Sequence, residues 1–259
     1  MPEIDVLLDL AKSTVTQAAQ RLLDQTGSAE RQYVHSTAHP KEIKAIIDSV
    51  MDEQIVRALS VSELSILSEE CGLIASHHRS SLRFIVDPLD GTFNYVKGLG
   101  PSAICVALWE DERPVFGVIY SLLERTLTWG GLGLGAFVDG RRISVSDTSV
   151  RALASICTGF PVRVDMDHER SMQTFWHMVK PYAKVRMFGS AAASLLHVAR
   201  GSADAYSESR IMLWDVAAGI AIVQGAGGAY VMKQAGDEEW CYEVFASNPA
   251  LLASCAGEA

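Results

Sequence analysis

The sequence predicts an α+β protein in which helices pack on two β-sheets. Three observations support this prediction: helical spacing of apolar residues near the N-terminus, consecutive short strands in the middle of the chain, and alternating strands and helices in the second half. The 259 residues contain no Pro- or Ser-rich linker. We therefore expect a single domain made of two closely packed halves, 1–150 and 151–259.

Two helices are expected at the N-terminal end. Apolar residues recur over 4–23 at the spacing of one helix face. A second helical pattern opens at Pro40 and ends at Leu59, and proline is favoured at the first position of a helix. The polar segment 27–37 between them is expected to be a loop.

The middle of the chain is expected to form an antiparallel meander. The run at 83–86 is expected to end at Asp87-Pro88, because proline cannot donate to the hydrogen-bonded ladder. Asp139-Gly140 is a strong signal for a hairpin turn. The expected strands are 65–68, 83–86, 102–109, 114–120, 125–129, 136–138 and 141–143.

Strands and helices alternate in the second half, which predicts a second sheet with helical cover. The expected strands are 153–157, 184–188, 203–207, 229–232 and 242–246. The expected helices are 168–181, a helix that Gly189-Ser190-Ala191 opens and that ends near Gly201, 213–225, and a short helix after Asn248-Pro249.

Charge and cysteine content narrow the classes of function. Lys and Arg number 22 against 31 Asp and Glu, and the net charge of −9 disfavours nucleic acid and anionic membranes as partners. The five cysteines form no CxxC pair, and the sequence shows neither a signal peptide nor an apolar stretch long enough to span a bilayer. We therefore expect a cytoplasmic protein with no nucleic-acid or membrane partner.

The candidate metal site is the segment Asp87-Pro88-Leu89-Asp90-Gly91-Thr92. Two carboxylates on one rigid turn can point to one spot, where they repel each other unless a cation lies between them. Gly91 permits close approach of the backbone and Thr92 adds a hydroxyl, and oxygen ligands of this kind suit Mg²⁺. An isolated Asp-Pro-x-Asp would more simply be a surface turn, but the complete segment favours a metal site.

Three further segments carry acidic or polar groups at the ends of expected elements. Glu69-Glu70 follows one strand, Glu208 lies at the end of another, and Asp215 lies in the first turn of a helix. Gly189-Ser190-Ala191 opens a helix whose free amides attract anions or hydroxyl groups. Taken alone, these features are also compatible with surface glutamates and ordinary helix N-caps.

Together, these segments resemble the motifs of the inositol monophosphatase family of Mg²⁺-dependent, lithium-sensitive phosphatases. The resemblance extends over nearly the whole chain. It rests on Leu67-Ser68-Glu69-Glu70, on residues 84–95, on Gly189-Ser190-Ala191-Ala192 and on Trp214-Asp215-Val216-Ala217-Ala218-Gly219. It implies an αβαβα layered sandwich, usually as a homodimer, that hydrolyses a small phosphorylated alcohol.

The resemblance also implies roles for individual residues. The implied metal ligands are Glu69, Asp87, Asp90, Asp215 and the backbone carbonyl of Leu89. The implied substrate-binding groups are Asp90, the amides of Gly91 and Thr92 at the phosphate, and Gly189, Ser190, Ala191 and Glu208 at the leaving alcohol. The groups implied to position the attacking water are Glu69, Thr92 and Asp48. The implied cofactor is Mg²⁺, as two or three ions, with Mn²⁺ as a substitute and Li⁺ and Ca²⁺ as inhibitors.

The expected function is hydrolysis of a phosphate monoester by in-line attack of a metal-activated water. Thr92-Phe93-Asn94-Tyr95 is similar to the form of this motif in inositol and sugar phosphatases, and this resemblance implies inositol monophosphate or a related sugar phosphate as the substrate. Fructose 1,6-bisphosphate, histidinol phosphate and a 3′-phosphonucleotide are alternative substrates. The family's Lys and Thr ahead of Asp48 are replaced by Thr37 and Ala45. This departure supports an alternative of another class, a non-catalytic binding or regulatory protein.

Overall fold

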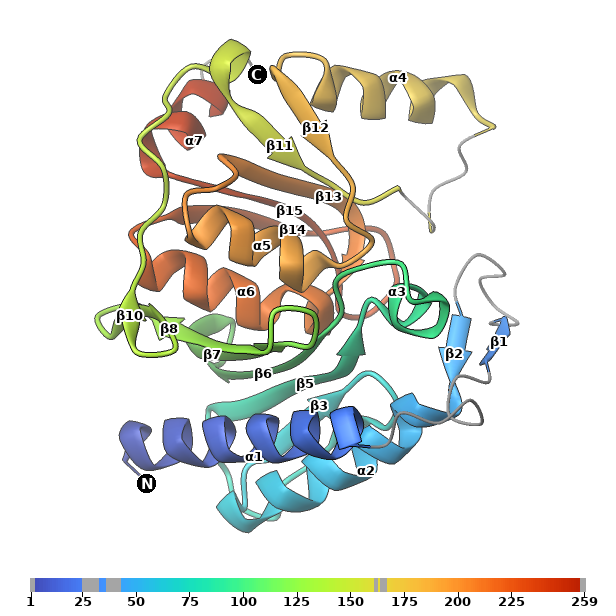
Figure 1. Ribbon diagram of the computed structural model, residues 1–259, viewed down its shortest axis with the longest axis vertical. Coiled ribbons are helices and arrows are strands. Elements are labelled where there is room, and N and C mark those ends of the chain that lie inside the picture. Colours follow the sequence, from blue (N-terminus) through green and yellow to red (C-terminus); the bar gives the residue numbers. More distant parts are fainter. Residues whose placement is uncertain (1–2, 25–32, 36–42, 161–162, 164–166, 257–259) are drawn as a thin grey trace.

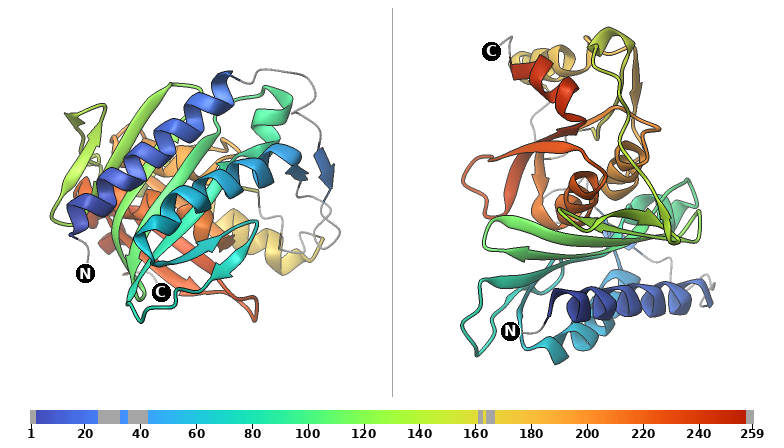
Figure 2. Two further views of the ribbon diagram at one scale, coloured as in Figure 1. Left: turned by 90° about the horizontal axis from the view of Figure 1, so that it is seen from below. Right: turned by 90° about the vertical axis from the view of Figure 1, so that its left-hand side faces the viewer.

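Helices and sheets alternate in five layers in the computed structural model, which describes residues 3–24, 33–35, 43–160, 163 and 167–256. The layers are two N-terminal helices, an eight-stranded sheet, two central helices, a five-stranded sheet and an outer pair of helices (Figure 1). A side view shows the layers stacked in this order (Figure 2). The predicted αβαβα class is confirmed.

The first layer consists of α1 (Ile4–Asp24) and α2 (Ile46–Leu59), which cover one face of the eight-stranded sheet. Leu8, Val15 and Leu22 of α1 lie on one helix face and are buried in the cluster between this layer and the sheet. Burial of an amphipathic face, more than intrinsic propensity, stabilises helices of this kind. The prediction of the first helix is confirmed.

The second helix starts later than predicted. Ile43–Ala45 form strand β2, which pairs antiparallel with β1 (Tyr33–His35) in the segment predicted to be a loop. Helical spacing is misleading here because a short apolar run fits a strand as well as a helix. Residues 36–42, Thr37 among them, and the side chain of Ala45 lie outside the described part of the chain.

The eight-stranded sheet has the strand order β10-β9-β8-β7-β6-β5-β3-β4. Strands β5 to β10 are consecutive and antiparallel, which confirms the predicted meander, whereas β3 is parallel to β5. Neither β4 nor the short helix α3 (Thr92–Lys97) is among the expected elements. The strands are β3 (Ser65–Ser68), β4 (Gly72–Ile74), β5 (Leu82–Asp90), β6 (Ala103–Glu110), β7 (Arg113–Ser121), β8 (Thr126–Gly131), β9 (Gly135–Val138) and β10 (Arg141–Arg142).

Strand β5 continues past its predicted end. It runs through Asp87-Pro88 to Asp90, and its register with β6 shifts between Asp87 and Asp90. This irregularity accommodates Pro88, which has no amide proton to donate, so the proline interrupts the ladder without ending the strand. The predicted end at Asp87-Pro88 is therefore wrong. Residues three apart point to opposite faces of a regular strand, so the same irregularity allows Asp87 and Asp90 to face one site.

The five-stranded sheet has the order β12-β11-β13-β15-β14 and contains both parallel and antiparallel pairs. Its strands are β11 (Ser155–Cys157), β12 (Lys184–Arg186), β13 (Ala205–Met212), β14 (Ala229–Gln234) and β15 (Cys241–Ser247). The accompanying helices are α4 (Glu169–Val179), α5 (Ala191–Ala199), α6 (Leu213–Gly225) and α7 (Pro249–Ala256), with short 3₁₀ turns at Ser60–Ser62 and Arg151–Leu153. The predicted alternation is confirmed, with β13 longer than expected. Within the described ranges, no helix combines the length and the apolar character needed to cross a bilayer.

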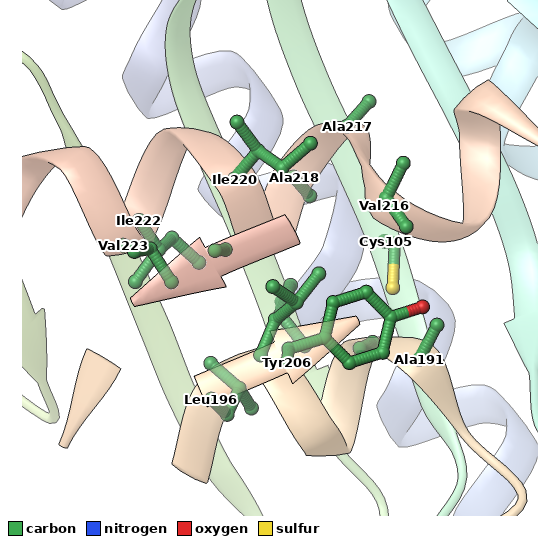
Figure 3. Packing of buried hydrophobic residues seen from close by; sticks show 14 of the residues in the cluster. Cys105, Ala191, Leu196, Tyr206, Val216, Ala217, Ala218, Ile220, Ile222 and Val223 are labelled. Atoms are coloured by element: carbon green, nitrogen blue, oxygen red, sulfur yellow. The ribbon is translucent and has the colours of Figure 1, made fainter. Parts of the chain in front are cut away.

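Helices α5 and α6 fill the space between the two sheets. Tyr206 of β13 and Cys105 of β6 are both buried in one cluster with Val216 of α6 (Figure 3). Helix α6 approaches β7 so closely that only glycine fits at one position. A Cβ atom added to Gly117 would lie 2.1 Å from the carbonyl oxygen of Ala218.

Gly117→Ala is expected to lower the free energy of unfolding by about 3 kcal/mol, because β7 and α6 would have to move apart and overpacking of a dense core is unfavourable. Urea titration followed by circular dichroism measures this change. Gly100→Ala is the matched control, since a Cβ atom there meets no other atom within 4 Å. Equal unfolding midpoints for the two variants would contradict the close contact between α6 and β7.

Candidate active site

Three carboxylates meet at the end of β5. Asp87 and Asp90 lie on either side of the β5 irregularity, and Asp215 enters from the first turn of α6. One oxygen atom of each side chain lies within 4.8 Å of the others. Asp87 is 1% exposed and Asp90 is 7% exposed, so the repulsion between these groups is little screened by water. The structure thus brings together three of the predicted metal ligands.

Asp87 carries the clearest sign of a missing partner. Its Oδ1 accepts a hydrogen bond from the Leu89 amide at 3.0 Å, whereas its Oδ2 is buried and has no hydrogen-bond partner. Burial raises the pKa of Asp87 well above its ordinary value, and the charges of Glu69, Asp90 and Asp215 raise the pKa further. A divalent cation would satisfy the buried oxygen and relieve the repulsion, so these residues fit a metal ion.

Asp90 connects β5 to the start of α5. It accepts hydrogen bonds from the amides of Ala191 and Ala192, each at 3.1 Å, and from the Ser190 hydroxyl. Burial raises the pKa of Asp90 to about 6, although these hydrogen bonds oppose the rise. Ser190 also caps α5 by accepting a hydrogen bond from the Ala193 amide at 3.0 Å. The predicted substrate-contacting groups Ser190 and Ala191 therefore also hold the carboxylate of a predicted metal ligand.

Asp215 both caps a helix and belongs to the carboxylate cluster, which are the two roles that its sequence position allows. Its Oδ2 accepts a hydrogen bond from the Met212 amide at 3.2 Å, which caps the start of α6. It also belongs to the carboxylate cluster, and burial, followed by the charges of Glu69 and Asp90, raises its pKa well above the ordinary value. Capping thus fixes the position of a carboxylate that belongs to the cluster.

The three residues predicted to position the attacking water are Glu69, Thr92 and Asp48. Glu69 follows β3, and its amide donates a hydrogen bond to the carbonyl of Val86 at 3.2 Å. Its side chain does not belong to the group of three carboxylates, but it lines the cavity described below. Thr92 Oγ1 donates to the carbonyl oxygen of Leu89 at 2.9 Å. The two carboxylate oxygens of buried Asp48 lie 3.5 and 3.4 Å from Thr92 Oγ1.

A cavity of about 290 Å³ opens over these residues. Gly91 lines this cavity with φ of 76°, and a Cβ atom there would lie 2.9 Å from the Pro101 carbonyl oxygen, so only glycine fits beside Pro101 at this position. The predicted site residues that line the cavity are Glu69, Asp90, Gly91, Thr92, Gly189, Ser190, Ala191, Glu208 and Asp215. Asp87, Leu89 and Asp48 lie behind this lining.

Glu208 reaches the cavity from β13. Tyr206 donates its hydroxyl to Glu208 Oε2 at 2.9 Å, and a Cβ atom added to Gly159 would lie 2.2 Å from Glu208 Oε1. Burial raises the pKa of Glu208 to about 7, with the hydrogen bond from Tyr206 opposing the rise. A protonated Glu208 can donate to a ligand hydroxyl and an ionised one can accept from it.

Arg163 and Gly159 also line the cavity, and sequence reasoning does not identify either. The charge of Arg163 lowers the pKa of Asp215 and of Glu208, against the larger effect of burial. No local pattern marks these residues, because neither lies in a helix or a strand. A cationic side chain beside a carboxylate cluster favours the binding of an anionic ligand.

These features place the protein among layered α+β proteins with a buried acidic site that can hold a metal ion. The chain belongs to the inositol monophosphatase family, whose model matches residues 3–255. Members of this family are generally metal-dependent phosphatases that act on small phosphate monoesters. The family resemblance seen in the motifs is confirmed.

Individual relatives have several names. A fructose-1,6-bisphosphatase/inositol-1-monophosphatase from Aquifex aeolicus is 30% identical over 253 residues, which cover 97% of this chain and 94% of that protein. The Nus factor SuhB of Xylella fastidiosa is 31% identical over 229 residues, 88% of this chain and 80% of the relative. The crystal structure of the extragenic suppressor protein SuhB from Bartonella henselae matches with a TM-score of 0.83 and 28% identity over 96% of both chains. These comparisons identify the family and the fold and leave the substrate open.

Proposed function

We propose that this protein is a Mg²⁺-dependent phosphomonoesterase that hydrolyses a small phosphorylated alcohol, either inositol monophosphate or a related sugar phosphate. The buried oxygen Asp87 Oδ2, which has no hydrogen-bond partner and lies in a cluster of three carboxylates, is the observation that carries the proposal. The residues proposed to hold the metal are Glu69, Asp87, Asp90, Asp215 and the carbonyl of Leu89. Bound Mg²⁺ supplies Lewis acidity and lowers the pKa of water.

The residues around the cluster provide the positioning that hydrolysis needs. Because Thr92 Oγ1 donates its proton to the Leu89 carbonyl, its lone pairs are left to accept a hydrogen bond from the attacking water. Asp48 and Glu69 add acceptors on the same side. The amides of Gly91 and Thr92 are proposed to donate to the phosphate, and Glu208 is proposed to hydrogen-bond the alcohol.

Phosphate release from a panel of monoesters tests this function. The panel contains inositol 1-phosphate, fructose 1,6-bisphosphate, histidinol phosphate and 3′-phosphoadenosine 5′-phosphate, each with Mg²⁺, with Mn²⁺, with EDTA and with added Li⁺ or Ca²⁺. We expect release that requires Mg²⁺ and is inhibited by Li⁺ and Ca²⁺, and the preferred ester then identifies the substrate. No release from any ester by protein that binds Mg²⁺ would favour the non-catalytic alternative.

The stabilisation of the protein by Mg²⁺ is expected to grow as the pH rises from about 5 to about 8, because only ionised carboxylates bind the metal. The pKa of Asp90 is raised to about 6 from an ordinary value of 3.8, so the folded protein without metal favours the protonated carboxyl group. The stability that this protonated group contributes is therefore fully present below pH 3.8 and is lost as the pH rises through about 6. The Tm shift caused by Mg²⁺, measured at both pH values against a NaCl control of equal ionic strength, checks this. An equal shift at the two pH values would contradict the proposed site.

We also propose that the chain is a single domain, forms a homodimer and works in the cytoplasm. Its net charge of −9 and its scattered cysteines support the compartment, and the family resemblance supports the dimer. Light scattering on the purified protein measures the oligomeric state directly, and a monomeric mass at micromolar concentration would reject the dimer.

A further inference from the structure

A second and larger cavity lies beside the proposed catalytic one. Its volume is about 600 Å³, and it lies between α4 and the face of the five-stranded sheet that α5 and α6 do not cover. Figure 1 shows α4 on this outer side of the sheet. Helix α4 lines the cavity with Arg170, Ser171, Thr174, Phe175 and Met178, which recur at the spacing of one helix face. We call this space the α4 cavity.

The sheet forms the opposite wall of the α4 cavity. Val231 and Lys233 of β14 and Phe245 of β15 belong to this wall, and Val231 pairs in register with Phe245. Tyr230, Met232 and Tyr242 alternate with them and pack against the central cluster instead. The strand alternation therefore assigns the wall residues to the outer face.

The α4 cavity adjoins the proposed catalytic cavity. Thr158, Gly159 and Glu208 line both of them. Gly159 has no side chain at the boundary between the two cavities. A Cβ atom there would lie 2.2 Å from Glu208 Oε1 and would crowd this boundary. A phosphate ester bound at the carboxylate cluster, with its alcohol at Glu208, therefore places that alcohol beside the α4 cavity, and a longer alcohol would extend past Glu208 into it.

The lining of the α4 cavity is amphipathic. Phe175, Met178 and Phe245 offer apolar surface. Three cationic side chains, Arg170, Arg210 and Lys233, line it against two carboxylates, Glu208 and Glu243, in a chain whose net charge is −9. Arg210 lies 3.9 Å from Glu238, whereas no ion pair within the described residues involves Arg170 or Lys233. An apolar body that ends in an anionic group matches this surface.

We propose that the α4 cavity binds the distal part of an extended substrate, a phosphate monoester whose alcohol has an apolar body and a second anionic group at its far end. This proposal rests on the proposed phosphatase function and defines the substrate class of the same site. Glu208 contacts the alcohol near the scissile bond, the aromatic and methionine side chains contact the body, and Arg170 and Lys233 bind the terminal anion.

Three esters test the proposal on the full-length protein with Mg²⁺: ethyl phosphate, octyl phosphate and 8-phosphonooxyoctanoate. We expect kcat/KM to rise from ethyl to octyl phosphate, because more apolar surface is buried, and to rise again with the terminal carboxylate. Lys233→Gln and Arg170→Gln are each expected to lower the ratio of kcat/KM for 8-phosphonooxyoctanoate to that for octyl phosphate by about tenfold. Lys184→Gln is the matched control, since Lys184 is also exposed and lines neither cavity.

Thr174→Trp gives an independent check, because this exposed position on α4 tolerates a large side chain that would fill the α4 cavity. It is expected to reduce kcat/KM for both octyl esters at least about tenfold more than for ethyl phosphate. Equal kcat/KM for all three esters, or ratios that no variant changes, would overturn the extended site and leave the phosphatase function standing. No phosphate release from these esters or from the panel above would overturn both.

Discussion

Replacing Asp87 with asparagine is expected to lower kcat/KM by at least about 10³-fold while leaving the metal-free protein no less stable than the wild-type chain. The Leu89 amide donates to Asp87 Oδ1 at 3.0 Å, and an asparagine carbonyl oxygen can accept the same bond. The second oxygen is buried without a partner, so the substitution removes no hydrogen bond. It does remove a group whose ionised form is strongly disfavoured by burial in the absence of a cation.

Phosphate release in Mg²⁺ measures the loss of activity, and urea unfolding in EDTA measures the stability of the metal-free protein. Mg²⁺ should raise the Tm of the wild-type protein and raise that of Asp87→Asn much less. A fully active variant would reject Asp87 as a metal ligand. A variant that unfolds in EDTA at much lower urea than the wild type would show that Asp87 has a structural role that its contacts do not reveal.

Asp90→Asn is the informative comparison, because the same chemical change should there reduce stability as well as activity. Asp90 accepts hydrogen bonds from the Ala191 and Ala192 amides and from the Ser190 hydroxyl. An asparagine side chain has one acceptor oxygen, so at least one donor at the start of α5 would lose its partner, at about 1–3 kcal/mol. The two substitutions together separate loss of the metal from loss of the fold.

Parts of this site could be predicted because they are encoded locally. Asp87 and Asp90 belong to one short segment with a proline and a glycine, and Asp215 starts a helix predicted at 213–225, the bounds of α6. The irregularity in β5 could not be predicted, because it depends on the pairing of β5 with β6. The sequence of β5 indicates only that it contains a proline, which a bulge can accommodate.

Other parts depend on contacts between distant segments. Tyr206 supports Glu208 from the same strand, but Gly159 and Arg163, which also line the cavity, lie in neither a helix nor a strand. The path of a loop is set by tertiary packing, and a sequence pattern of period two or 3.6 residues carries no information about it. The strand pair β1–β2 could not be predicted for the same reason, because it depends on pairing between two short segments that are separate in the sequence.

Thr92→Val is expected to lower kcat by about 10²-fold with little change in KM, because the hydroxyl positions the attacking water and contributes little to binding of the ester. Valine keeps the branched shape of threonine at the start of α3. It cannot donate to the Leu89 carbonyl oxygen, which lies 2.9 Å from Thr92 Oγ1, or approach the Asp48 carboxylate, whose nearer oxygen lies 3.4 Å away. The attacking water would then lose one of its three proposed acceptors, and Asp48 and Glu69 would remain.

The matched control is Thr92→Ser, which keeps the hydroxyl and removes only the methyl group, and it should retain most of the activity. Steady-state kinetics of both variants on the preferred ester, together with the Tm shift caused by Mg²⁺, distinguish the possible causes. If Thr92→Val loses the Mg²⁺ shift along with its activity, the hydroxyl acts by holding the Leu89 carbonyl at the metal. If the shift persists and kcat alone falls, the hydroxyl acts on the water. Equal activity of the valine and serine variants would contradict both, since only the valine variant lacks the hydroxyl.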